Sequence, residues 1–84
     1  MTREEFIQMS LAEQGMALIN DGKHLTQVQK GNQLMNLYSV HDFFVEVIYS
    51  VLSEKIDKIE VISDLSRIDH YIEENQKQEK LHLN

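Results

Sequence analysis

Apolar side chains recur along the chain with two different periods, and the change of period separates helical from extended segments. Near the N-terminus, Ile7, Leu11 and Leu18 fall on one helical stripe, because they are spaced to lie on one side of a helix. Residues 23–63 instead alternate between apolar and polar positions, as strands do. The helical period returns after Leu65. This order predicts an α-β-β-β-β-α chain.

The N-terminal segment predicts one helix over about residues 3–20. Thr2–Glu5 has the Thr-x-x-Glu form of a capping box, in which a hydroxyl oxygen and a carboxylate each satisfy a free backbone N–H. Ser10–Glu13 is a second possible capping box, and Gly15 costs about 1 kcal/mol relative to alanine inside a helix. A break into two helices is therefore the alternative. Asn20–Gly22 ends the segment, since Gly tolerates the left-handed backbone that closes many helices.

Four strands are predicted over residues 23–29, 33–40, 42–50 and 56–63. Their connections are too short for parallel pairing, so the strands form an antiparallel meander. The turn His41-Asp42 is not a preferred pair for a two-residue hairpin, which leaves a longer turn open. A second helix, capped by Ser63 or Asp64, is expected from Leu65 to about Gln76.

The third strand has one fully apolar face and one mixed face. We expect the apolar face to pack against both helices, and the other face to remain uncovered. The fold class is then α+β, a two-layer sandwich, with one domain over residues 1–75 and a polar tail, residues 76–84, that frays. A one-residue slip in register would exchange the faces. The apolar face carries Phe43, Val45, Val47 and Tyr49, the mixed face carries Phe44, Glu46, Ile48 and Ser50, and Met9, Met16 and Met35 are assigned to the core.

The predicted outer face is too apolar to be left to solvent. A contiguous apolar patch of several hundred Å² on a small protein usually marks a partner or a dimer. Lys58 is expected within cross-strand reach of Glu46. The predicted interaction face consists of Met35, Leu37, Phe44, Glu46, Ile48, Ile56, Lys58 and Ile62.

Composition narrows the class of protein. With 84 residues and 42% apolar residues the chain can build one core, and without cysteine it has no disulfide, thiolate nucleophile or cysteine-based metal site. The net charge of −6 is spread along the chain, so nucleic acid and anionic membranes are not expected partners. The acidic N-terminus does not resemble a secretory signal and no window approaches the length of a membrane span, so a cytoplasmic location is expected.

Candidate chemistry is sparse. No nucleophile elbow or phosphate-binding glycine pattern occurs, and His24, His41, His70 and His82 are scattered. His70-x-x-Glu73 reverses the order found in di-iron bundles and has no second copy, and the adjacent pair His41-Asp42 rarely aims at one point. We therefore expect no catalytic residues, no metal and no cofactor. Burial of Glu46 would raise its pKa and mark a site, whereas a solvent-facing position is the favoured alternative.

Part of the chain resembles a known set of proteins. Leu37-Tyr38, residues 43–49 and residues 56–61 carry a resemblance to short, uncharacterised bacterial proteins, many from Bacteroidetes. The resemblance covers about residues 22–72. It implies a compact bacterial domain and no particular activity.

Three functions are compatible with the sequence. The favoured one is a non-catalytic interaction protein that self-associates as a homodimer, or binds a protein partner, through the outer sheet face. The second is a small-ligand-binding or enzymatic domain that uses Glu46, Tyr49 and a histidine. The third, suggested by the acidic balance, is a nucleic-acid mimic or an inhibitor of a nucleic-acid enzyme.

Overall fold

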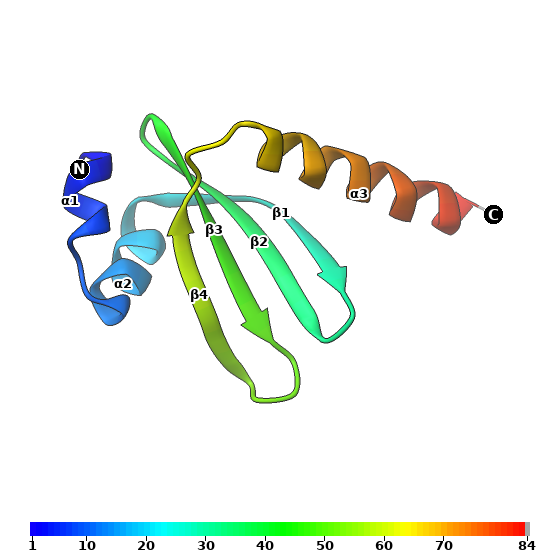
Figure 1. Ribbon diagram of the computed structural model, residues 1–84, viewed down its shortest axis with the longest axis horizontal. Coiled ribbons are helices and arrows are strands. Elements are labelled where there is room, and N and C mark those ends of the chain that lie inside the picture. The colour runs from blue at the N-terminus through cyan, green and yellow to red at the C-terminus, as the bar shows by residue number, and fades with distance from the viewer. Residues whose placement is uncertain (84) are drawn as a thin grey trace.

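The computed structural model describes the backbone of residues 1–83 and the side chains of residues 1–77. The four strands form one antiparallel sheet in the order β1-β2-β3-β4, with helices before and after it (Figure 1). The predicted topology is confirmed, and the predicted strands agree with the observed ones to within two residues at each end. The elements are α1 (Arg3–Ile7), α2 (Leu11–Asp21), β1 (Gly22–Lys30), β2 (Gln33–Val40), β3 (Phe43–Ser50), β4 (Lys55–Val61) and α3 (Ser66–Leu83).

The N-terminal segment forms two helices, so the single helix over residues 3–20 is wrong and the alternative is observed. Both capping boxes are complete: Thr2 exchanges hydrogen bonds with Glu5, and Ser10 does the same with Glu13. An N-cap residue needs extended backbone, and Ser10 has φ −67° and ψ 165°. The second cap therefore interrupts the helix that the first one starts.

Helices α1 and α2 pack on the sheet face that carries Phe43, Val45 and Val47, here called the inner face. Phe6 of α1 is fully buried, and its ring lies 5.8 Å from that of Phe43. Ala17 and Leu18 of α2, together with Val40 and Val61 of the sheet, complete this cluster. The predicted core face of the third strand is thus confirmed for these residues.

Helix α3 packs on the opposite, outer face, so the prediction that both helices share one face is wrong. Tyr71 of α3 is 1% exposed and packs in a cluster with Val28, Met35, Leu37 and Ile48. The chain changes sides after β4, where the Ile62 N–H still donates to the Phe44 carbonyl at 2.9 Å. The apolar outer face is covered intramolecularly, and the molecule has three layers.

The last helix is longer than predicted. It continues past the expected end at Gln76 to Leu83, through most of the predicted tail, and its C-terminal end extends beyond the sheet (Figure 1). Asp64, rather than Ser63, provides the side-chain cap, since its Oδ1 accepts the Ser66 N–H at 3.0 Å. Asn84 lies outside the described residues. Within residues 1–83 no helix has the length and apolar character that a membrane crossing requires.

Register places most side chains on the expected faces. Val40 pairs with Phe43 and Tyr38 pairs with Val45, so the turn between β2 and β3 has two residues, and His41 takes a positive φ of 52° to close it. Pairing of β3 with β4 shifts between Ile48 and Tyr49.

The shift places Ile56, a residue of the predicted interaction face, on the other side of the sheet. Lys58 pairs with Ile48 and Ile56 pairs with Tyr49, so Asp57 is the extra residue of a bulge. Ile56 therefore lies on the inner face, and its predicted outer position is wrong.

Candidate interaction surface

Only part of the apolar surface of helix α2 packs against the sheet. One stripe, containing Ala17 and Leu18, is buried against the sheet. A second stripe follows the spacing i, i+3, i+4, i+7, and its two large members are open to solvent: Met16 is 57% exposed and Ile19 is 77% exposed. The second stripe consists of Ala12, Gly15, Met16 and Ile19.

The second stripe forms one wall of a groove on the inner face, which we call the α2 groove. Its volume is about 390 Å³. No charged side chain lines it, although charged residues make up 26% of the chain. The sheet contributes the floor and the opposite wall from β2, β3 and β4. The groove is lined by Ala12, Gly15, Met16, Leu18, Ile19, Tyr38, Val47, Ile56 and Ile59.

A polar network holds the floor of the α2 groove in place. Asn36 is 8% exposed, and its Oδ1 accepts the Gln27 Nε2–H at 2.9 Å and lies 3.1 Å from His24 Nε2. Its amide nitrogen donates to two backbone carbonyls, those of Leu34 and Val47. The His24 ring also packs edge-on to Tyr38, a groove residue, with centroids 5.1 Å apart. Because these bonds use the whole amide of Asn36, the network supports the floor and leaves no polar group of Asn36 for a ligand.

A larger hollow of about 720 Å³ lies where the N-terminus meets the turn between β2 and β3. Its charged lining residues, Arg3, Glu4 and Asp42, are all exposed. Arg3 Nη2 donates to Ser63 Oγ at 2.7 Å, so its guanidinium is already engaged. Exposed charges of both signs around an open hollow do not converge on one ligand atom, and we place no site there.

The structure distributes the predicted interaction face over four environments. The prediction assumed that the outer face is open, whereas α3 covers most of it. Met35, Leu37, Glu46 and Ile48 are buried, Phe44 and Ile62 are half-buried beside them, Lys58 is exposed, and Ile56 lines the α2 groove on the other face.

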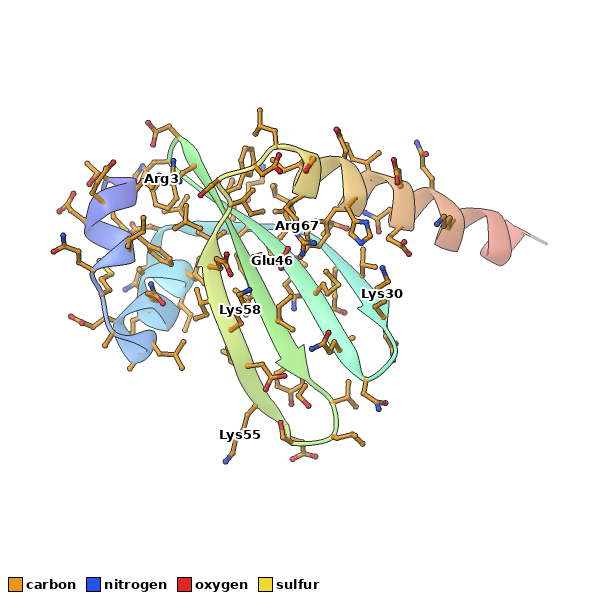
Figure 2. All side chains as sticks on the ribbon, in the orientation of Figure 1. Arg3, Lys30, Glu46, Lys55, Lys58 and Arg67 are labelled. Carbon is orange, nitrogen blue, oxygen red and sulfur yellow. The ribbon has the colours of Figure 1, made fainter. Side chains whose placement is uncertain are left out.

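Glu46 is buried by α3 and paired with a residue of that helix. Arg67 Nη2 donates to both carboxylate oxygens, at 2.8 and 2.6 Å, and Figure 2 shows the two side chains meeting between α3 and the sheet. These hydrogen bonds raise the pKa of Arg67, against the opposing effect of its partial burial. The expected partner, Lys58, instead pairs with Glu60 on its own strand at 2.5 Å. Glu46 is thus a structural ion-pair residue.

The hydroxyl of Tyr71 lies within the same outer cluster. It is buried and has no hydrogen-bond partner among the described residues. Burial raises the pKa of this phenol above its ordinary value, and the negative charge of Glu46 adds to the increase. Arg67 and Tyr71 are four residues apart and share a helix face, a spacing visible in the sequence, but their partner could not be predicted while α3 was assigned to the wrong side.

The other predicted chemical groups do not assemble. Tyr49 pairs with Leu34 and Ile56, on the face opposite to Glu46, so these two residues do not share a pocket. His41 and Asp42 lie in an exposed turn, and His70 Nε2 is 3.4 Å from Lys30 Nζ. The described part of the chain contains no group of three His, Asp or Glu side chains that could hold a metal ion, and the side chain of His82 lies outside it.

Comparisons with protein-family models, with curated proteins and with solved structures found no match. The case for a function therefore rests on the geometry of the α2 groove.

Proposed function

We propose that this protein is a non-catalytic interaction module that binds an apolar helix of a protein partner in the α2 groove. The observation that carries the proposal is the exposure of Met16 and Ile19, at 57% and 77%, directly beside the buried residues Leu18 and Val47. Large apolar side chains gathered in one open groove are unfavourable in water unless another surface covers them. The proposal keeps the function class suggested by the sequence and moves it from the outer to the inner face.

The shape and chemistry of the groove favour a helix as its occupant. Helix α2 has 11 residues, so the groove beside it is about 16 Å long, enough for three turns of a second helix. Helix-in-groove binding uses apolar anchors at i, i+3, i+4 and i+7, the spacing that the second stripe of α2 itself displays. A polar small molecule would find no charged lining residue, and the amide of Asn36 is fully hydrogen-bonded.

Site-specific photo-crosslinking in the native host tests the proposal. We would replace Ile19 with p-benzoylphenylalanine, and in a matched control replace Leu52, which is also 77% exposed but lies in the turn between β3 and β4. We expect a discrete crosslinked species of defined mass from position 19 and none from position 52, because only the first lies in the groove. Equal labelling at both positions, or none at position 19, would contradict the proposal.

A further inference from the structure

We infer that the helix that fills the α2 groove is α2 of a second copy of this chain, packed antiparallel across a two-fold axis. This inference rests on the proposed function and names its partner. It is carried by the match of the second stripe of α2 to itself in shape and by the absence of charged side chains from the groove.

The second stripe combines two projections with two recesses. Met16 and Ile19 project, whereas Gly15 has no side chain, and apart from the nearby backbone of α2 no atom lies within 4 Å of the place where a Cβ would stand. If two α2 helices cross antiparallel at Gly15 and Met16, Met16 of each copy meets Gly15 of the other. Ile19 then meets Ala12 of the other copy. Each projection faces a recess, which is the self-complementarity that a two-fold interface requires.

Shape selects the antiparallel arrangement, because parallel helices would set Met16 against Met16 and Ile19 against Ile19 of the other copy. Helix α2 contains two acidic residues, Glu13 and Asp21, and no basic residue. At about 100° per residue, both acids lie off the second stripe, and Asp21 points to the opposite side of α2. Neither acid is therefore brought against the second copy by the antiparallel contact. The groove lining contains no charge that would be buried unpaired.

The two-fold arrangement also accounts for the uncovered part of the inner face. Ile56, 43% exposed, and Ile59 lie across the groove from α2, where the second α2 would cover them. The two α2 helices would then lie between two sheets. Helix α3 packs on the outer face of each sheet, so it does not obstruct the contact.

Sedimentation equilibrium of the purified protein tests the inference. We expect a dimer at about 100 μM, and we expect Ile19→Lys to weaken the dimer at least about tenfold, while Leu52→Lys leaves it unchanged. Gly15→Leu adds apolar surface, yet it should also weaken the dimer because it fills the recess for Met16. Unspecific apolar sticking would be strengthened by the same substitution, and that result would overturn the inference. Circular dichroism verifies that each variant is folded.

The dependence of association on salt distinguishes a second copy of this acidic chain from a partner helix of positive charge. Each copy carries a net charge of −6, so raising NaCl from about 0.05 M to about 0.5 M should strengthen the dimer by screening repulsion. A monomer at about 100 μM, or a dimer that weakens with salt, would overturn the inference. If position 19 nevertheless crosslinks to a different protein, the proposed function stands with another partner, whereas loss of both results removes both proposals.

Disulfide trapping can determine the relative orientation of the two α2 helices, because the chain has no cysteine of its own. A protein with Ala12→Cys is mixed with a protein with Ile19→Cys under mild oxidation. The antiparallel arrangement predicts a mixed disulfide between the two variants and little disulfide in either one alone. Efficient Ala12→Cys homodisulfide would show parallel helices and overturn the arrangement.

Discussion

At the scale of single residues, the outer cluster depends on one buried carboxylate and the guanidinium that neutralises it. The Glu46 side chain is 9% exposed, whereas that of Arg67 is 45% exposed. The two partners therefore differ in what they lose when the other is removed. Glu46 without Arg67 is a buried charge with no partner, but Arg67 without Glu46 can still be hydrated.

This asymmetry predicts unequal effects on stability. Arg67→Met should lower the free energy of unfolding by about 3 kcal/mol. Glu46→Gln should lower it by about 1 kcal/mol, because glutamine keeps a hydrogen-bond acceptor at the same place. The double variant Glu46→Leu/Arg67→Met should recover most of the loss, since it leaves no buried charge. Urea denaturation of the three variants measures these values, and equal losses for the two single variants would contradict the asymmetry.

Tyr71→Phe should leave the free energy of unfolding unchanged at neutral pH, or raise it by about 1 kcal/mol, because it removes a buried hydroxyl that has no described hydrogen-bond partner. The pKa of Tyr71 is raised in the folded protein. The unfolded chain therefore releases this proton at lower pH than the folded protein does. The free energy of unfolding is unaffected by this titration below the unfolded-state pKa, about 10, and falls as pH rises above it.

The Phe variant should consequently lose less stability than the parent between about pH 9 and pH 11. Chemical denaturation across this range compares the two proteins. Tyr49→Phe, at a half-buried tyrosine outside the outer cluster, is the control. Identical alkaline profiles for the parent and Tyr71→Phe would show that the buried phenol does not control this titration.

At the scale of elements, the glycine within α2 and the glycine that ends it have different physical roles. Gly15 faces open space, and apart from the nearby backbone of α2 a Cβ there would meet nothing within 4 Å. Gly22 ends α2 with an ordinary φ of −86°, so the left-handed backbone expected from the sequence does not occur. Glycine is required there because a Cβ would lie 2.6 Å from the Leu18 carbonyl oxygen.

These environments predict opposite effects for the same substitution. Gly15→Ala should raise the free energy of unfolding by about 1 kcal/mol, the difference in helix propensity. Gly22→Ala should lower the free energy of unfolding, because the added Cβ would clash with the Leu18 carbonyl oxygen and the backbone must move to relieve the clash. Thermal unfolding at a concentration low enough to keep the protein monomeric measures both. A stabilised Gly22→Ala variant would contradict the steric role.

Sequence patterns predicted the elements better than their assembly. Alternation placed Phe43, Val45 and Val47 on one face correctly, because side chains of a strand must point to alternate sides. It could not decide which helix covers which face, since both faces of β3 are largely apolar. Nothing in the sequence marks Asp57 as a bulge, so Ile56 was assigned to the wrong side. Met16 was assigned to the core because periodicity identifies an apolar stripe without showing whether anything covers it.

At the scale of the whole molecule, helices pack on both faces of the sheet, but only the inner face keeps an open apolar groove. Helix α3 closes the outer face through Tyr71 and Arg67. On the inner face, α1 and α2 leave the α2 groove uncovered. The sequence-based prediction assumed an uncovered outer face, because it placed the last helix on the inner face. The proposed binding surface is thus defined by where the helices stop covering the sheet.

The order of the strands also governs how the chain reaches this structure. Each strand pairs with the one that precedes it, so every step of sheet formation closes only a short turn and no crossover has to form first. The chain contains no proline, so prolyl isomerisation cannot delay any of these steps. Sheet growth can therefore proceed hairpin by hairpin, with each new strand pairing along the open edge that the preceding strand leaves.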